Sequence, residues 1–392
     1  MTEKSLRGLF KKTYKFLPEV SSSAPGRINI IGEHTDYNQG YVLPAAINSR
    51  NYFLGSTRDD NRVFIWAENF KEEENFSLKN ISYSKQKRWI NYIKGIFWIL
   101  KKEGFLLQGI NGLLWGNIPL EAGLSSSAAL EISVINCLDE LFKLNLTKEK
   151  KAFLAQKAEN DFVGVKCGLM DQFISVFGQK DKAMFLDCET LHFDLIPLNL
   201  EKVNLKILVY DSQVRRQLAS SQYNKRRQEA ELALSYLKKN GYEGFKDVNS
   251  EALEKIRKRM DGITYKRARH IISENMRVKR AVRALRDDDF LLLGDLLYLS
   301  HESLRDDYEV SCPELDVLYE AGKDFSGCLG ARLTGAGFGG SGIALVKNEK
   351  VEDFKKKVLE IADKKLFHEP KIYEISVGGG ANAYSVSKER KR

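Results

Sequence analysis

The spacing of hydrophobic residues changes several times along this 392-residue chain. In its first part, short runs of β-branched and aromatic residues are separated by turn residues, a pattern typical of β-strands. These runs lie at residues 27–31, 41–47, 51–57 and 62–67. A helical period follows at residues 87–104, and another strand-like run occupies residues 110–118. The first part of the chain is therefore expected to be rich in β-structure.

The next part of the chain returns to a helical period. Leu130, Val134 and Leu138 recur at helical spacing, so a long helix is predicted to begin inside residues 123–144. A second helix is predicted over about residues 148–162. The pattern then changes back to apolar runs of strand type, which cover residues 183–188, 191–198 and 205–212.

The second half of the chain is dominated by long charged helices, followed by a mixed C-terminal part. The helices are predicted at about residues 219–239, 266–287 and 288–305. The mixed part contains a glycine-rich segment at 330–346, a helix at 351–366 and a strand at 371–377. These elements predict an α+β fold. We place a domain boundary near residue 195, between an N-terminal domain 1–195 and a C-terminal domain 196–392.

Composition and charge narrow the possible partners. Hydrophobic residues make up 43% of the chain and charged residues 29%, which is ordinary for a globular protein with a sizeable core. The net charge is +9, from 62 Lys and Arg against 53 Asp and Glu, and such a surplus can attract a phosphorylated small molecule. The short basic clusters at 224–228, 265–270 and 388–392 lack interleaved aromatic residues, so nucleic-acid binding is not expected.

The chain shows no signs of membrane insertion or secretion. No apolar run reaches membrane-spanning length, and residues 1–16 lack the continuous apolar stretch of a secretory signal. An odd number of cysteines without a C-x-x-C pair argues against a disulfide framework or a zinc site. They are Cys137, Cys167, Cys188, Cys312 and Cys328. We therefore expect a cytoplasmic protein with reduced thiols and no membrane partner.

A crowded polar turn follows the first strand, in the sequence INIIGEHTDYNQG. After an apolar run that stops at a glycine come Glu33, His34, Thr35 and Asp36. These side chains suit a polyhydroxylated ligand, because each can form directional hydrogen bonds with neighbouring hydroxyls. A metal site is a second interpretation, although one histidine with two acids is a poor donor set for zinc. A turn whose side chains serve only structure is a third.

A glycine and three serines stand where the long helix at 123–144 is predicted to start, in PLEAGLSSSAAL (119–130). Helix N-termini present unpaired N–H groups and the positive end of the helix dipole, so small residues there let a phosphate approach the backbone. Simple N-capping by serine is the alternative. No Walker-type G-x-x-x-x-G-K-[ST] motif occurs in the chain.

A second glycine-rich segment, GARLTGAGFGGSGIALV, formally contains G-x-G-x-x-G at Gly335, Gly337 and Gly340. A dinucleotide-binding fingerprint requires a helix directly after the glycines, whereas SGIALV is typical of a strand. We therefore reject a dinucleotide site. A structural turn and a ligand-facing loop both remain open for this segment.

Two acids lie in positions that need an explanation. Glu159 shares a helix face with Ala152, Ala155 and Phe162, so it is an acid on an otherwise apolar stripe. A buried acid needs a partner, which can be a metal ion or a basic side chain. Asp171 opens a helix after a glycine-bounded loop, a position that suits helix capping and also suits a general base.

Together these stretches resemble the three motifs of the GHMP small-molecule kinase superfamily, and PGRINIIGEHTDYNQGYVLP is similar to the galactokinase signature in particular. The likeness covers about residues 20–380. It includes WINYIKG, VRRQLASSQYNKRRQEAE, RARHIISEN and HESLRDDYEVSCPELDVL. The resemblance implies a two-lobed GHMP kinase fold with the active site in the cleft between the lobes. It also implies transfer of the ATP γ-phosphoryl group to the C1 hydroxyl of α-D-galactose, giving galactose 1-phosphate and ADP.

The resemblance also implies roles for individual residues in the sugar site and in catalysis. Asp171 would be the base that faces the C1 hydroxyl. Arg27 would hold that aspartate ionised and stabilise charge on the transferring phosphoryl group. The sugar hydroxyls would be bound by Glu33, His34, Thr35, Asp36, Gly168 and Tyr223.

On the nucleotide side, the resemblance implies a loop around the ATP phosphates, with Trp89 near the adenine. The loop comprises Glu121, Ala122, Gly123, Leu124, Ser125, Ser126 and Ser127. Mg²⁺ would be held by Ser127 and Glu159, and the third motif would brace the phosphate loop and the sugar site. Galactose and ATP are therefore the expected partners, and we expect the protein to act as a monomer.

The chain departs from the family pattern at a few positions, and two other functions are compatible with its sequence. Glu121 replaces a usual glycine, Lys166 a usual proline, and Ser341–Gly342 a common Cys-Thr. One alternative is a related sugar 1-kinase acting on N-acetylgalactosamine, galacturonate or arabinose. Another is a non-catalytic galactose and ATP sensor, against which the retention of Asp171 and Arg27 argues.

Overall fold

The N-terminal part of the chain forms a six-stranded sheet in the order β13-β1-β3-β6-β4-β5, in which only the β4–β6 pair is parallel. The structure is a computed structural model that describes residues 1–119, 122–214, 219–365 and 369–386. The strands are β1 (Val20–Asn29), β3 (Pro44–Thr57), β4 (Arg62–Ala67), β5 (Glu72–Ser77), β6 (Ile110–Gly116) and β13 (Asn382–Ser385).

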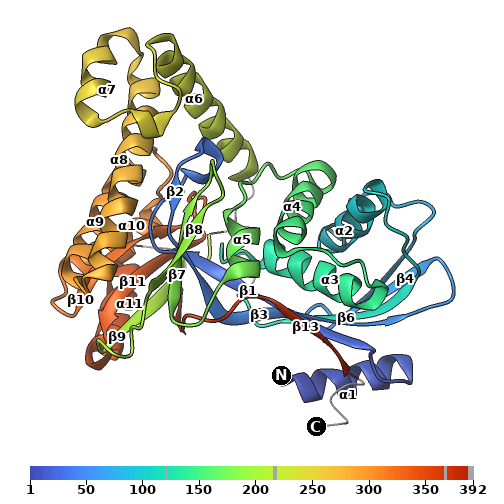
Figure 1. Cartoon of the computed structure of the whole chain (residues 1–392). Coiled ribbons are helices and arrows are strands. Elements are labelled where there is room, and N and C mark those ends of the chain that lie inside the picture. Colours follow the sequence, from blue (N-terminus) through green and yellow to red (C-terminus); the bar gives the residue numbers. More distant parts are fainter. Residues whose placement is uncertain (120–121, 215–218, 366–368, 387–392) are drawn as a thin grey trace.

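Helices cover both faces of this sheet because its strands are apolar on both sides (Figure 1). Successive residues of a strand point to opposite faces. Phe53 belongs to the core under the main helical layer, whereas its neighbour Leu54 packs with Leu6 and Phe10 of α1 (Glu3–Tyr14). The main layer contains α2 (Ile90–Lys102), α3 (Ser126–Phe142), α4 (Lys148–Ala158), a π-helix (Glu159–Val163) and α5 (Met170–Phe177).

The second lobe is built on a four-stranded antiparallel sheet in the order β10-β11-β9-β12. Its strands are β9 (Leu205–Asp211), β10 (Cys328–Thr334), β11 (Ser341–Lys347) and β12 (Lys371–Ile375). The helices of this lobe are α8 (Gly262–Arg286), α9 (Phe290–Asp306), α10 (Pro313–Lys323) and α11 (Val351–Lys365). Helices α6 (Ala219–Lys239) and α7 (Ser250–Ile256) project from the body beside the start of α8 (Figure 1).

A shared apolar core joins the two lobes. Ile28 of β1, Leu296 of α9 and Ile343 of β11 belong to one buried cluster. A small sheet in the order β2-β7-β8 lies between them, formed by β2 (Tyr41–Val42), β7 (Lys182–Asp187) and β8 (Phe193–Pro197). The two-lobed α+β fold expected from the sequence is confirmed.

Most of the expected elements are present, and physical reasons explain why the sequence pattern does not predict β5, α1 and β13. The strand β5 reads EEENFS and has only Phe76 buried, so it shows no apolar run. Helix α1 buries only two side chains and is otherwise charged. Strand β13 pairs with β1 across more than 350 residues of chain, as in the Ser23–Asn382 pair. The domain boundary near residue 195 remains a prediction, and β13 returns from beyond it to the first sheet.

The structure also bears on the cysteines, the glycine-rich segment and the question of membrane-spanning helices. All five cysteines are free thiols. The glycine-rich segment 335–340 leads directly into strand β11, so the rejection of a dinucleotide fingerprint is confirmed. Within the described part of the chain, no helix combines the length and apolarity needed to span a bilayer.

Candidate active site

The centre of the candidate site is an ion pair between Arg27 of β1 and Asp171 of α5. Arg27 Nε donates to Asp171 Oδ1 at 2.8 Å and Arg27 Nη2 donates to Asp171 Oδ2 at 3.0 Å. This two-pronged geometry fixes the plane of the carboxylate as well as its position. Asp171 lies inside the first turn of α5, whose N-cap residue is Leu169, so the helix-capping interpretation is wrong.

The same arginine connects the acid to the serine-rich loop. Arg27 Nη1 donates to the carbonyl of Gly123 at 2.8 Å, and its backbone N–H donates to the carbonyl of Leu124 at 3.0 Å. The Ser125 hydroxyl donates to Asp171 Oδ2 at 2.5 Å and makes no capping bond to α3, so Ser125 is not an N-cap of the usual kind. The loop therefore lies directly against the predicted catalytic pair.

Close packing at Gly26 makes this approach of strand and loop possible. A Cβ atom at Gly26 would lie 2.6 Å from the carbonyl oxygen of Leu124, which is closer than real contacts allow. On the other side of the loop, the Ser341 hydroxyl donates to the carbonyl of Ala122. Ser126 is held by Asn51, whose amide donates to its carbonyl at 2.8 Å. The third motif thus contacts the serine-rich loop through Ser341, one of the departures from the family pattern.

Glu33 links the polar turn to the third motif. Glu33 Oε1 accepts hydrogen bonds from the N–H of Gly335 at 2.7 Å and from the hydroxyl of Thr334 at 3.1 Å. Its other oxygen accepts from Asn29 Nδ2 at 2.9 Å, and only 2% of the residue is exposed. Glu33 therefore braces the third motif against the turn, and its predicted role with sugar hydroxyls stays a prediction.

His34 is buried beside three tyrosines. Its Nε2 lies 3.2 Å from the carbonyl oxygen of Ala336, which can only accept, so Nε2 carries the proton. Its Nδ1 then accepts from the Tyr37 hydroxyl at 2.7 Å. The ring centroids of Tyr308 and Tyr223 lie 4.7 and 5.7 Å from that of His34. Burial lowers the pKa of His34 to about 3, so the imidazole is neutral at physiological pH.

Thr35 and Asp36 have different environments although they are neighbours in sequence. The Thr35 hydroxyl lies 2.9 Å from the carbonyl of Gly32 and 2.7 Å from that of Tyr41, and the residue is fully buried. The Thr35 hydroxyl therefore lies between the two ends of the turn, at Gly32 and Tyr41. Asp36 instead faces Asp171, and burial, followed by that neighbouring charge, raises the pKa of Asp36 to about 7.

Gly168 and Tyr223 complete the group predicted to bind the sugar. A Cβ atom on Gly168 would lie only 1.9 Å from Asp36 Oδ2. The Tyr223 ring centroid lies 5.4 Å from that of Tyr37, and burial with the charge of Asp36 raises the Tyr223 pKa well above its ordinary value. The structure thus brings together Asp36, Gly168 and Tyr223, which come from three separate segments.

For galactose, the sugar that the resemblance implies, replacing Gly168 with alanine is expected to raise the KM at least about tenfold, because the added methyl group displaces the Asp36 carboxylate. The KM for ATP should change little. Gly262→Ala is the matched control, since a Cβ atom there meets no neighbour within 4 Å. Steady-state kinetics with each substrate varied would measure both effects. A Gly168→Ala variant with an unchanged galactose KM would contradict the placement of Asp36 in the sugar site.

The predicted metal residues Ser127 and Glu159 lie together under the loop. Glu159 is 5% exposed and accepts a hydrogen bond from Gln172 Nε2 at 2.9 Å, and the Ser127 hydroxyl lies near enough to favour its ionised form. Burial and the nearby charge of Asp171 raise the pKa of Glu159 to about 7. Among the described residues no basic side chain pairs with Glu159, so the salt-bridge interpretation is not realised there.

A second buried acid, Glu131 of α3, was not singled out from the sequence. It is fully buried beside Glu159, and burial together with that charge raises its pKa well above the ordinary value. Glu131 Oε1 and Gln172 Oε1 are buried without a hydrogen-bond partner. The sequence contains one indication of its position: Glu131 follows Ser127 by one helical turn, so the two residues lie on the same face of the helix.

These buried oxygens fit a divalent cation. Mg²⁺ is commonly held by one or two carboxylates together with the phosphates of a nucleotide. Within the described ranges no group of three or more His, Cys, Asp or Glu side chains is arranged to hold a metal without such help. The donor set of Ser127 and Glu159, with Glu131 and Gln172 behind it, therefore suits a metal that binds together with ATP.

Two predicted nucleotide residues, Trp89 and Glu121, remain to be placed, together with Lys166, a departure from the family pattern. Trp89 precedes α2 and stacks on Phe70 with ring centroids 5.8 Å apart, and its role near the adenine stays a prediction. Glu121 lies outside the described residues. Lys166 Nζ donates to the carbonyl of Asn160 at 3.1 Å, in the loop that precedes Asp171.

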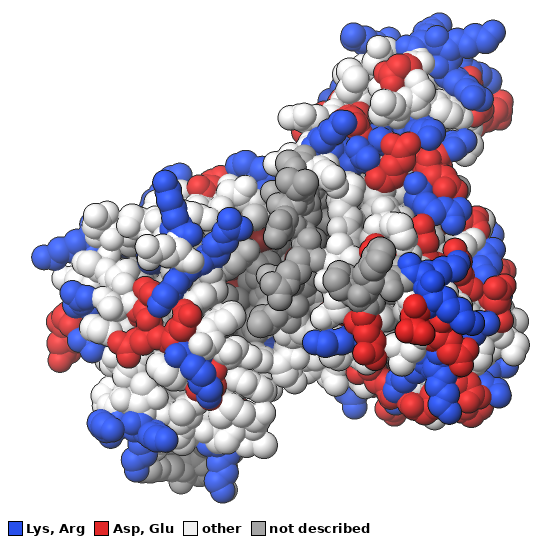
Figure 2. All heavy atoms as spheres, turned by 180° about the vertical axis from the view of Figure 1, so that it is seen from behind, with Lys and Arg blue, Asp and Glu red and all other residues white. Residues whose placement is uncertain are grey.

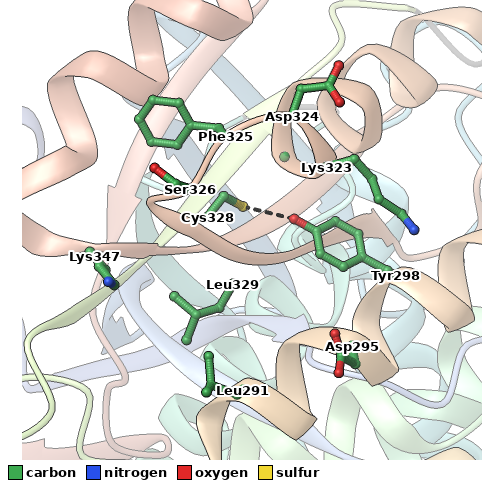
Figure 3. A pocket seen from close by; sticks show the side chains of 11 residues that line it. Leu291, Asp295, Tyr298, Lys323, Asp324, Phe325, Ser326, Cys328, Leu329 and Lys347 are labelled. Carbon is green, nitrogen blue, oxygen red and sulfur yellow. Dashed lines mark hydrogen bonds between the residues drawn. The ribbon is translucent and has the colours of Figure 1, made fainter.

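A separate pocket lies on the second lobe (Figure 3). It has a volume of about 710 Å³ and is lined by parts of α9, α10 and β10, including Tyr298, Lys323 and Cys328. None of the predicted site residues lines it. The molecule is also hollowed between its two halves, and the acidic and basic side chains on that face are intermixed (Figure 2).

Comparison with known protein families agrees with this geometry. The galactokinase galactose-binding signature matches residues 8–57, the GHMP kinases N-terminal domain matches 91–179, and the GHMP kinases C-terminal domain matches 281–363. Together with the two-lobed fold and the meeting of the three motifs, these matches define a small-molecule kinase of the GHMP class. Mevalonate kinase, with 19% identity and a TM-score of 0.63, shares the fold.

Individual relatives identify the family within that class. A galactokinase of Clostridium perfringens strain 13 is 41% identical over 381 residues, covering 96% of this chain and 98% of the relative. One of Thermotoga petrophila is 45% identical over 341 residues, covering 85% and 93%. The crystal structure of Lactococcus lactis galactokinase complexed with galactose is 38% identical with a TM-score of 0.92, covering 97% and 99%. The chain belongs to the galactokinase family.

Proposed function

We propose that this protein is an ATP-dependent galactokinase that phosphorylates the C1 hydroxyl of α-D-galactose. The observation that carries the proposal is the position of Arg27, which holds Asp171 with two hydrogen bonds and the Gly123 carbonyl of the serine-rich loop with a third. A single cation thus joins the predicted base to the predicted phosphate loop. Asp36 of the polar turn lies close enough to the same aspartate for the charge of Asp171 to raise its pKa.

In the proposed reaction, the C1 hydroxyl of the sugar faces the Asp171 carboxylate, which orients the hydroxyl and accepts its proton. The C1 oxygen forms a bond to the γ-phosphorus as the bond from that phosphorus to the β,γ-bridging oxygen breaks, and ADP leaves. Because the transition state spreads negative charge over the transferring phosphoryl group, the rate enhancement comes mainly from positioning the two substrates and from neutralising that charge. Arg27 is the described cation best placed to supply that charge.

Ser127 and Glu159 would hold Mg²⁺, with the Gln172 amide orienting the Glu159 carboxylate. When bound with ATP, the ion supplies positive charge to the phosphate oxygens. The amide groups of the loop from Ala122 to Ser127 would then surround the phosphates at the start of α3. The buried carboxyl groups of Glu131 and Glu159 would repel each other when ionised, and a cation beside them would offset that repulsion.

The sugar preference follows from the acids of the site. Galacturonate carries a carboxylate, which Glu33, Asp36 and Asp171 would repel, so we place it below galactose as a substrate. N-acetylgalactosamine and arabinose are tested by comparing their kcat/KM values with that of galactose. A value for either sugar more than about tenfold above that of galactose, roughly 1.4 kcal/mol of transition-state binding, would assign the protein to the other sugar.

A galactose-dependent ADP-release assay tests the proposed activity directly. We expect ADP release that requires galactose, ATP and a divalent metal, with galactose 1-phosphate formed in equal amount. Binding of galactose and ATP without turnover would instead support the non-catalytic sensor. Retention of the Arg27–Asp171 pair with its full geometry favours the enzyme.

Galactose affinity is expected to fall as the pH drops below about 7. Without sugar, the raised pKa of Asp36, about 7, leaves this carboxyl protonated below that pH. The ionised Asp36 carboxylate accepts more hydrogen bonds from sugar hydroxyls than the protonated form does, so galactose binds the ionised form more tightly. Below the pKa, Asp36 must therefore release a proton when the sugar binds, and this weakens binding as the pH falls. The neutral His34, with a pKa of about 3, does not titrate in this range.

Titration calorimetry across about one pH unit on either side of the Asp36 pKa would measure this dependence, with an affinity loss of up to about tenfold per unit at the acidic end. An Asp36→Asn variant should bind more weakly and with a flat profile. Galactose affinity that is constant or rises toward acidic pH in the native protein would contradict the expectation.

We also propose a cytoplasmic, monomeric protein with domains 1–195 and 196–392. The small charged metabolites that it would use, ATP above all, support a cytoplasmic location. Gel filtration with light scattering would test the oligomeric state.

A further inference from the structure

The segment RARHIISEN lies on α8, a helix of the second lobe to which the proposed reaction assigns no role. Its residues Glu274 and Asn275 are both buried, with exposed fractions of 0% and 4%. Buried polar groups in folded proteins are hydrogen-bonded, so their partners show what these side chains stabilise. Those partners belong to the polar turn that contains the predicted sugar-binding residues.

Glu274 holds the beginning of that turn. Its Oε1 atom accepts hydrogen bonds from the backbone N–H of Gly32 at 2.9 Å and from that of Glu33 at 3.4 Å. Gly32 has a φ of +101°, and a Cβ atom there would lie 2.7 Å from the Tyr41 carbonyl oxygen, so the chain reverses tightly at this residue. Without an acceptor, these two N–H groups would be buried and unpaired.

Glu274 is itself held rigidly. Arg277 Nε donates to its Oε2 at 2.6 Å, and the Ser300 hydroxyl of α9 donates to its Oε1 at 2.6 Å. The charge of Arg277 and the polar contacts outweigh burial and lower the pKa of Glu274 to about 2. The side chain is therefore a permanently ionised acceptor whose position is set by two helices.

Asn275 holds the end of the same turn. Its Oδ1 atom accepts a hydrogen bond from the backbone N–H of Tyr41 at 2.9 Å and lies 2.5 Å from where a Cβ atom of Gly40 would be. One turn earlier on α8, His270 Nε2 lies 3.1 Å from the carbonyl oxygen of Glu33. One face of α8 thus contacts both ends of the turn.

We propose that Glu274 and Asn275 are positioning residues that hold the turn from Gly32 to Tyr41 in its sugar-binding conformation and thereby set galactose affinity. The inference rests on the proposed function only in taking galactose as the ligand of the turn. Neither side chain touches the reacting atoms. Their effect is exerted through the backbone that places His34 and Asp36, so it belongs to sugar binding and not to the phosphate loop.

The Asn275→Ala and Asn275→Asp variants test the proposal as a pair. Alanine leaves the Tyr41 N–H without its acceptor, and we expect galactose Kd and KM to rise about tenfold while the ATP KM stays within about twofold. Aspartate restores an oxygen at the same place and should recover most of the affinity. Glu302→Gln on α9 is the control, because Glu302 pairs with Tyr319 and Lys323 away from the turn.

Calorimetric galactose affinity, the two KM values and the melting temperature distinguish positioning from general destabilisation. A purely structural role would lower the melting temperature and the active fraction while leaving both KM values unchanged, and that outcome would overturn the proposal. An Asn275→Asp variant as impaired as Asn275→Ala would also overturn it. Glu274→Ala, which removes the acceptor of the Gly32 and Glu33 N–H groups, gives a second test if Asn275→Ala does not fold, with the same expected rise in galactose KM.

The proposed function and this inference fail in different ways. Native protein that binds galactose without releasing ADP would contradict the kinase, while the affinity ratio between Asn275→Ala and native protein would still decide the positioning role. Native protein that phosphorylates galactose, with an Asn275→Ala variant of unchanged galactose affinity, would contradict only the inference.

Discussion

Asp171→Asn is expected to lower kcat for galactose phosphorylation by about a thousandfold, within the range that proton transfer by a positioned side chain contributes. Asparagine has nearly the same shape as aspartate, so the contacts with Arg27 and Ser125 can be partly kept while the proton acceptor is lost. Galactose affinity should change little, because the sugar-binding turn is held separately by Glu33 and α8.

Single-turnover kinetics and calorimetric galactose binding would separate the two effects in this variant. Asp324→Asn is a suitable control, since Asp324 is exposed and lines the pocket on the second lobe (Figure 3). Turnover that survives in Asp171→Asn would remove this residue from the mechanism. A loss of galactose affinity equal to the loss of kcat would assign Asp171 to binding instead of chemistry.

Arg27→Met is expected to lower kcat/KM by about a hundredfold to a thousandfold, comparable to the loss of one charged or oxyanion-stabilising donor. The change removes the cation beside the transferring phosphoryl group and three hydrogen bonds, two to Asp171 and one to Gly123. Arg27→Lys should recover part of the loss, because it restores the charge but cannot make the two-pronged contact with the carboxylate.

A double-mutant cycle with Asp171→Asn would measure how far the two residues act as a unit. Because the arginine acts partly through the aspartate, we expect the double variant to lose much less than the sum of the two single losses in free energy. Arg58→Met is the control, since Arg58 pairs with the exposed Asp60. Fully additive losses would show that Arg27 and Asp171 contribute independently.

The candidate site was predictable from sequence where a local pattern pointed to chemistry. Asp171 at a loop–helix junction, Glu159 on an apolar helix face and the serine-rich helix start each stood out, and the structure brings all three together around Arg27. Arg27 itself came only from the resemblance to a family. An arginine inside a strand has no local signal that distinguishes it from a surface residue.

Other contacts had weaker signals or none. Glu131 lies one helical turn after Ser127, but a single acid in an apolar helix does not show that its carboxylate meets Glu159. The hydrogen bond from Gly335 to Glu33 joins positions 302 residues apart. The sequence places Glu33 among the expected sugar-binding residues but does not reveal that bond, because its partner is a backbone N–H in another lobe.

The sequence by itself determined where most of the strands and helices run, since hydrophobic periodicity is a local property of the chain. It also determined which short segments hold polar residues suited to a sugar and a triphosphate. Only the tertiary structure decided that Arg27 reaches both Asp171 and Gly123, that α8 holds the polar turn, and that β13 closes the first sheet. These contacts join residues that are far apart in the sequence, and their geometry depends on how the two lobes pack. The local hydrophobic periodicity of the sequence carries no information about that packing.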